Sequence, residues 1–192
     1  MPSLPEQDNV IFHEMMTHPA LFTHPCPREV VIIDENTSGI HEQTLKHAGV
    51  HVTHYHANQG DQWIRDIAPG SLDILIIASP HNSILLPEYF NLLNTHGILV
   101  QQAESLFHTD SIKLLHQHLI TAKFRDVHTL HFPQPNFPSG WRTALMAIKQ
   151  SGFKRPREKD IFNKSFRTHY YNLDTHKAAL ALPEFLKEVM VS

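Results

Sequence analysis

A run of four β-branched apolar residues, Val30 to Ile33, ends abruptly in polar residues. Such a run is typical of a parallel strand buried on both faces, and Thr37 or Ser38 can cap the helix that follows. In a doubly wound sheet, ligands bind at the carboxyl end of such a strand, where glycines let the backbone approach them. The turn at residues 34–39 reads DENTSG and offers only Gly39. The sequence therefore predicts a ligand-binding type of βα unit without its glycine-rich turn.

Further strand and helix patterns alternate along the chain. Leu72 to Ala78 is apolar on both faces, which predicts a central strand, and Ile98 to Val100 is a third apolar strand. Weaker strand patterns cover residues 50–56, 127–132 and 141–148, and helical patterns cover residues 8–18, 40–48, 63–67, 88–93 and 109–120. This alternation predicts an α/β fold with a Rossmann-like, doubly wound, mostly parallel sheet and helices on both faces.

Local signals predict how these elements begin and end. Thr109 or Asp110 is the candidate cap of the helix over residues 109–120. Asn94 to Gly97 has the composition of a turn. The mixed charges of residues 154–160 indicate a solvated loop rather than a nucleic-acid patch, because acidic residues interrupt the basic ones.

The length of 192 residues suits one core, so we expect residues 1–192 to form a single Rossmann-like domain. Residues 1–27 are predicted as a helical lead-in and residues 150–192 as a C-terminal extension. A final helix opened by Pro183 is expected to bury Phe185, Leu186, Val189 and Met190.

Composition excludes several classes of protein. A net charge of −3 gives no reason to expect nucleic acid as a partner. No apolar run is long enough to span a membrane, and the polar start is no signal peptide. The single cysteine, Cys26, fits a reducing compartment. We therefore expect a cytoplasmic protein without membrane or nucleic-acid contacts.

The chain carries 17 histidines, which raises the question of metal binding. The densest group is His51, His54 and His56, but on a strand His54 and His56 share one face while His51 lies on the other. No third ligand stands at a zinc-type spacing. We therefore predict no metal site and interpret the histidines mainly as tolerated surface residues, with a histidine-rich metal-binding protein as the alternative.

Four segments, taken together, resemble one enzyme family. Residues 12–25 read FHEMMTHPALFTHP, 97–101 read GILVQ, 137–140 read FPSG and 169–183 read HYYNLDTHKAALALP. They resemble, in the same order, the segments YHEMxxHxPLxxHP, GGILVxQ, YPSG and RYYNxxxHxAAFALP of spermidine synthases, the polyamine aminopropyltransferases. The resemblance runs from about Asp8 to the end of the chain.

The resemblance implies a methyltransferase-type Rossmann fold that lacks the family's N-terminal β domain. It implies transfer of the aminopropyl group of decarboxylated S-adenosylmethionine to putrescine, which releases methylthioadenosine. Such a reaction needs carboxylates that hold the diamine and a base that neutralises one amine. After Asn58, the chain also omits what corresponds to a helix and an edge strand of the family, so a different strand becomes the edge of the sheet.

At several positions the family's site residues are replaced. The family's glycine turn GGGDGG falls on residues 34–39, which begin with Asp34, and its polyamine-binding Asp falls on Thr37. The acidic residue that binds the ribose falls on His56. The two catalytic carboxylates of its DxxD motif fall on Ala78 and His81, so neither is kept.

Other positions are retained or changed conservatively. His13 matches a histidine near the polyamine, with Glu14 beside it, and Phe137 stands where the family has a tyrosine. Asp61 matches the Asp that contacts the adenine. The resemblance therefore implies substrate contacts at His13, Glu14 and Phe137, and nucleoside contacts at Asp61, His56 and Asp34.

Three interpretations remain open. The first is a catalytically lapsed homologue that binds a polyamine, a nucleoside such as decarboxylated S-adenosylmethionine or methylthioadenosine, or a protein partner, either another copy or another protein. The second is an active aminopropyltransferase with an atypical site. The third is a metal-binding protein on the same fold. The loss of both carboxylates at positions 78 and 81 favours the first.

Overall fold

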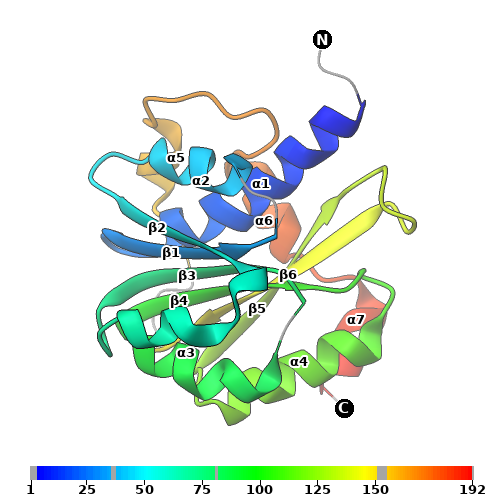
Figure 1. The fold of residues 1–192 in the computed structure, drawn as a ribbon. Coiled ribbons are helices and arrows are strands. Elements are labelled where there is room, and N and C mark those ends of the chain that lie inside the picture. Colours follow the sequence, from blue (N-terminus) through cyan, green and yellow to red (C-terminus); the bar gives the residue numbers. More distant parts are fainter. Residues whose placement is uncertain (1–3, 36–37, 81, 151–154, 192) are drawn as a thin grey trace.

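The computed structural model describes residues 4–35, 38–80, 82–150 and 155–191. Within these ranges a six-stranded sheet has the order β2-β1-β3-β4-β6-β5 (Figure 1). The strands are β1 (Glu29–Asp34), β2 (His51–His56), β3 (Leu72–Ala78), β4 (Leu93–Ala103), β5 (Asp126–Pro133) and β6 (Trp141–Ile148). The first four run parallel, whereas β6 is antiparallel to both β4 and β5. The predicted α/β fold with a mostly parallel sheet is confirmed.

The three most apolar strands lie next to one another at the centre of the sheet, as predicted. Val30 pairs with Ile74, and Ile74 pairs with Ile98. Every residue of β3 before Ala78 is buried. Burial of each large aliphatic side chain stabilises a fold by roughly 1.5–3 kcal/mol, so this sequence pattern strongly favours the central position.

The predicted turn at Asn94–Gly97 is wrong, because these residues lie inside β4. The pairing of β3 with β4 shifts register here, from Leu72 opposite Leu93 to Ile74 opposite Ile98. The Asn94 side chain donates to the carboxylate of Asp73 and accepts from the backbone N–H of His96 at 2.9 Å. The turn-forming composition therefore produces an irregularity within a strand instead of ending one.

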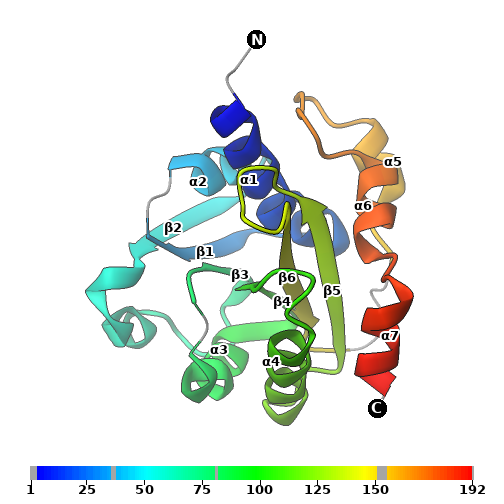
Figure 2. The ribbon, with the colours of Figure 1, turned by 90° about the vertical axis from the view of Figure 1, so that its right-hand side faces the viewer.

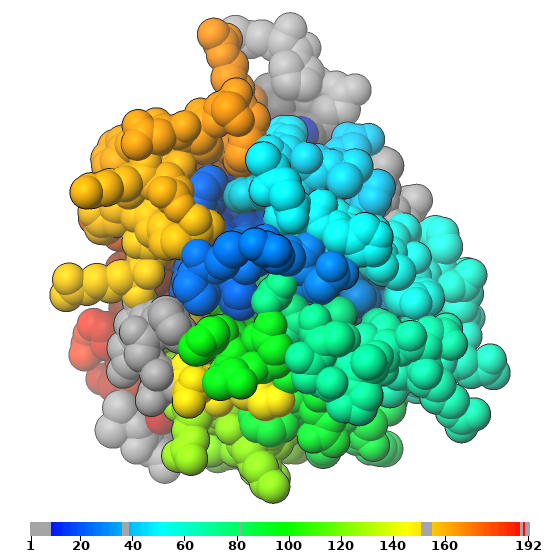
Figure 3. Space-filling model, turned by 90° about the vertical axis from the view of Figure 1, so that its left-hand side faces the viewer, coloured from blue at the N-terminus to red at the C-terminus, as the bar shows by residue number. Residues whose placement is uncertain are grey.

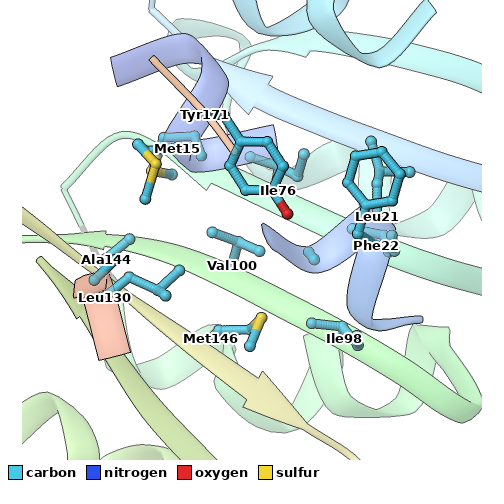
Figure 4. Packing of buried hydrophobic residues seen from close by; sticks show 14 of the residues in the cluster. Met15, Leu21, Phe22, Ile76, Ile98, Val100, Leu130, Ala144, Met146 and Tyr171 are labelled. Carbon is cyan, nitrogen blue, oxygen red and sulfur yellow. The ribbon is translucent and has the colours of Figure 1, made fainter. Parts of the chain in front are cut away.

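Helices cover both faces of the sheet (Figures 1 and 2). One face carries α1 (Leu4–Thr23), α2 (Ser38–Leu45), α5 (Glu158–Phe162) and α6 (Leu173–Leu180). The other carries α3 (Leu86–Leu92), α4 (Thr109–Thr121) and α7 (Glu184–Val191), together with the short 3-10 helices η1 (Ala57–Gln59), η2 (Asp61–Asp66) and η3 (Ser83–Leu85). Figure 4 shows how Met15, Leu21 and Phe22 of α1 pack over Ile76 and Val100.

Several helix boundaries differ from those predicted. α1 covers Leu4–Thr23 rather than residues 8–18. His108 occupies the N-cap of α4 without a side-chain bond, so Thr109 and Asp110 lie inside the helix. Thr37 and the side chain of Ser38, the predicted caps of α2, lie outside the described residues.

The C-terminal extension is more helical than expected. Part of the predicted loop at 154–160 forms α5, and α6 was not predicted at all. In α7, Leu186 is buried as expected, whereas Phe185 remains 40% exposed and stacks on Phe107 at the surface. The side chain of Val189 lies outside the described residues. No helix in the described ranges is long and apolar enough to cross a membrane.

On the face at the amino ends of β1 and β2, segments 24–30, 46–51 and 155–166 lie side by side (Figure 3). Arg157 joins the segment 155–166 to the last turn of α1. Its backbone N–H donates to the carbonyl of Phe22 at 2.8 Å, its guanidinium donates to the carbonyl of Leu21 at 2.9 Å, and it pairs with Asp160. The C-terminal extension is thereby fixed to the end of α1.

Glu14 ties α1 to the C-terminal extension. Its side chain is buried, and its carboxylate accepts hydrogen bonds from the backbone N–H groups of His169 at 2.7 Å and of Tyr170 and Tyr171 at 2.8 Å each. Hydrogen bonds to a charged acceptor are about twice as strong as neutral ones. The carboxylate therefore satisfies three backbone donors that the fold places in its interior.

We predict that Glu14→Gln lowers the free energy of unfolding by about 3 kcal/mol, because the neutral amide cannot accept all three N–H groups and leaves buried donors unpaired. Urea unfolding of the purified protein measures this change. Glu188→Gln, on the exposed surface of α7, is the matched control and should change it by less than about 0.5 kcal/mol. Equal effects of the two substitutions would contradict a structural role for the Glu14 carboxylate.

Most described histidines are at least partly exposed, as expected, but four of the described ones are buried: His18, His24, His47 and His176. His18 Nδ1 lies 2.9 Å from His47 Nε2, and Nδ1 of His176 lies 2.8 Å from the Tyr171 hydroxyl. Burial lowers the pKa of His47 and of His176 to about 4, and it lowers the pKa of His18 well below its ordinary value. These side chains are neutral parts of the core at pH 7.

These pKa shifts predict a loss of stability in acid. The pKa of His47 and of His176 is about 4 in the folded chain but near 6.5 when unfolded, so between these values only the unfolded chain takes up protons. Stability is therefore complete above pH 6.5 and falls toward pH 4, by up to about 1.4 kcal/mol per pH unit for each histidine. Urea unfolding at pH 7.5 and 5.0 should show this, and His47→Gln should reduce the slope. An equal free energy at both pH values would contradict the prediction.

Candidate binding cleft at the carboxyl ends of β1 and β3

A cleft of about 500 Å³ opens at the carboxyl ends of the central strands, where doubly wound folds bind their ligands. α1 forms one wall, and the ends of β1, β3 and β4 form the floor. The described residues that line it are Asn9, Phe12, His13, Asp34, Glu35, Ile40, Ala78, Ser79, Pro80, Gln102, Gln134 and Arg142. Of the predicted site residues, this cleft brings together His13, Asp34 and Ala78.

His13 lies directly against the start of α2. A Cβ atom added to Gly39 would lie 2.0 Å from His13 Nδ1, so only glycine leaves room for the ring. Burial lowers the pKa of His13, while the charges of Asp34 and Glu42 partly oppose this shift. An imidazole that is neutral at pH 7 can accept a proton, so His13 is the candidate base of the cleft.

Arg142 supplies a positive charge that the sequence analysis did not anticipate. Its guanidinium carbon lies 4.2 Å from the ring centroid of Phe137 and 5.6 Å from that of Phe12. Burial lowers the pKa of Arg142, yet a guanidinium stays protonated in proteins. Phe137 is not among the described residues that line the cleft, but its ring contacts this cation. No feature of the local sequence singles out Arg142.

The end of β3 contributes no carboxylate to the described part of the cleft. Ala78, Ser79 and Pro80 stand there, and the carbonyl of Ser79 accepts a hydrogen bond from the Gln101 side chain at 3.0 Å. His81, on which the second carboxylate position falls, lies outside the described residues. Among the described lining residues, the acidic ones are Asp34 and Glu35.

Asp34 is directed partly away from the cleft. It is 1% exposed, and its Oδ1 lies 2.9 Å from Nε2 of His54 on the neighbouring strand. Its Oδ2 is buried and has no hydrogen-bond partner. A buried carboxylate oxygen without a partner is rare in folded proteins.

The other predicted site residues lie outside the cleft. Glu14 is enclosed beneath residues 169–171, where it accepts three backbone hydrogen bonds. Asp61 is exposed at the start of η2, and burial together with the charge of Asp61 raises the pKa of the Tyr89 hydroxyl. His56 is exposed at the end of β2, opposite Asp34 in register.

Known proteins are similar in sequence to this one over nearly its whole length. No protein-family model matches it. The polyamine aminopropyltransferase of Halorhodospira halophila is 38% identical over 224 aligned positions, which take in 96% of this chain and 81% of that protein. The polyamine aminopropyltransferase of Thioalkalivibrio sulfidiphilus is 37% identical, and the alignment takes in 96% of this chain and 80% of that protein.

Two solved structures share the fold. A spermidine synthase in complex with the transition-state analogue AdoDATO matches with a TM-score of 0.85 at 20% identity, over 95% of this chain and 75% of that one. The spermidine synthase of Thermotoga maritima gives the same TM-score at 21% identity, over 95% and 74% of the two chains.

The strand order and these matches define a Rossmann-like α/β protein of the methyltransferase type. Within that class, the chain belongs to the polyamine aminopropyltransferase, or spermidine synthase, family. The aligned positions outnumber the residues of this chain, so the relative carries residues that this chain lacks. Among the described strands, β2 is the edge on the side where the omission after Asn58 is expected.

We predict that Gly39→Ala moves the His13 ring out of its position, since the added methyl group would overlap it. Greater exposure of the ring to water should raise the pKa of His13 toward its ordinary value. A histidine NMR titration measures this pKa, with His13→Gln to identify the resonance. An unchanged pKa in Gly39→Ala would contradict the contact.

Proposed function

We propose that this protein is a catalytically lapsed member of its family, whose cleft binds a small ligand without transferring an aminopropyl group. The observation that carries the proposal is that Ala78, Ser79 and Pro80 at the end of β3 offer no carboxylate to a substrate. A diamine substrate carries two positive charges, and neutral side chains cannot hold it in line with a sulfonium carbon.

Two further features of the cleft support this proposal. Arg142 lines the cleft, and its positive charge disfavours a dicationic diamine there. Asp34 has one oxygen engaged by His54, so it is only partly available to a substrate amine. The phenylalanine and arginine wall instead suits an aromatic or partly anionic ligand, because a guanidinium binds anions and stacks on rings.

An active enzyme with an atypical site is the second candidate. His13 favours it, since a neutral imidazole in the cleft can take a proton from an attacking amine. Glu35 is an exposed carboxylate at the rim that could attract a cation. In this case decarboxylated S-adenosylmethionine would be the donor and putrescine the acceptor.

Of the two ligand classes that the family resemblance implies, a polyamine and a nucleoside such as methylthioadenosine, the cleft favours the nucleoside, because Arg142 repels a polycation. The protein works as a homo-oligomer or with another protein. The free, exposed Cys26 suits the reducing cytoplasm.

We predict that the purified protein makes no spermidine above background from putrescine and decarboxylated S-adenosylmethionine, because the carboxylates that orient the diamine are missing from β3. Chromatographic product analysis measures this, with the Halorhodospira halophila relative as the positive control. Spermidine formation that is lost in His13→Gln would overturn the proposal and establish the second candidate.

Calorimetry with methylthioadenosine, as part of the same test, separates binding from turnover. A lost charge-assisted hydrogen bond is worth about 1.5–3 kcal/mol, and each 1.4 kcal/mol is about tenfold in affinity. With His56 in place of a ribose carboxylate, binding no tighter than the high micromolar range is expected. A low-micromolar dissociation constant that collapses in Asp61→Ala would contradict this expectation.

A further inference from the structure

Three potential metal ligands from two neighbouring strands converge on one face of the sheet. β1 and β2 are parallel, with Ile32 opposite His54 and Asp34 opposite His56 (Figure 1). Because side chains alternate along a strand, Asp34, His54 and His56 all project to the face covered by α1 and α2. The sequence alone predicts that His54 and His56 share a face, but it does not associate them with Asp34, which lies on a different strand.

We propose that Asp34, His54 and His56 bind a divalent metal ion of the zinc type. One ligand atom from each residue can be chosen so that all three lie within 4.8 Å of one another. Ligands around a tetrahedral zinc ion, at about 2.0–2.1 Å from it, lie roughly 3.3 Å apart. Small side-chain rotations close this difference, and the imidazole rings of His54 and His56 are already 5.0 Å apart.

The Asp34 carboxylate provides independent support for a cation at this place. It is 1% exposed, and its Oδ2 has neither a hydrogen-bond donor nor water access. Burial of an unpaired carboxylate oxygen is unfavourable unless a positive charge or a donor compensates it. A bound metal ion supplies that charge and leaves His54 in place beside Asp34.

The site is also accessible from solvent. The His54 side chain is 23% exposed, and His56 is exposed at the end of the edge strand. Three protein ligands leave one coordination position for water, as in metal sites that exchange ligands. The ring of His41 in α2 lies 6.2 Å from that of His54.

The types of ligand atom indicate which class of metal ion the site would bind. Two imidazoles and one carboxylate suit zinc and its neighbours copper and nickel, whereas magnesium and calcium require oxygen ligands. The site lies on β1 and β2, and the inference holds whether or not the cleft has kept aminopropyl transfer.

The test is calorimetric titration of the full, untagged protein with Zn²⁺, followed by Co²⁺ absorption spectroscopy to report the ligand geometry. We expect one ion per chain at micromolar affinity or tighter. His54→Gln, His56→Gln and Asp34→Asn should each weaken binding by at least about tenfold. His51→Gln should leave it unchanged, because His51 lies on the same strand but faces the opposite side and pairs with Glu29 at 3.1 Å.

The result that overturns the proposal is Zn²⁺ binding that His51→Gln weakens as much as His56→Gln, since this would indicate unspecific binding by a histidine-rich surface. Full affinity in His56→Gln would overturn it equally. His56 is exposed, so this variant folds even where Asp34→Asn does not and keeps the test decisive. Binding of Mg²⁺ at the same affinity would contradict the assigned class of metal.

Discussion

The buried Glu14 carboxylate is the contact on which the cleft depends most. It joins α1 to residues 169–171, segments more than 150 positions apart, through three backbone hydrogen bonds. His13 precedes it on the same helix, so the contact that fixes the helix also fixes the imidazole in the cleft. Tyr171, held by Glu14 through its backbone, stacks on Phe22 with ring centroids 5.7 Å apart and extends the same anchor along α1.

The central strands could be predicted because strands buried on both faces need continuous apolar runs, as Leu72–Ala78 shows. The place of Asn94 inside a strand could not be predicted. The composition around Asn94 favours a turn, but its side chain bonds to Asp73 on another strand. α6 did leave a local signal, because Asn172 and Thr175 form a capping box at its start. The start of α6 is therefore readable from the local sequence.

Some residues of the candidate site could be predicted from the sequence, and others could not. His13 could be identified because it belongs to a contiguous motif, and the structure does place it in the cleft. Arg142 and the Asp34–His54 pair could not, because they depend on which strands are neighbours and in which register. Glu14 shows the opposite case, in which a motif position near a substrate turns out to be a buried part of the framework.

The place of β2 at the margin of the sheet has a consequence for the dynamics of the protein. An outermost strand shares backbone hydrogen bonds with one neighbour, here β1, so it opens more readily than the centre of a sheet. Its polar composition and exposed ends, His51 and His56, make it a poor template for edge-to-edge pairing with other chains. Local opening of β2, without global unfolding, would therefore be enough to separate His54 and His56 from Asp34 on β1.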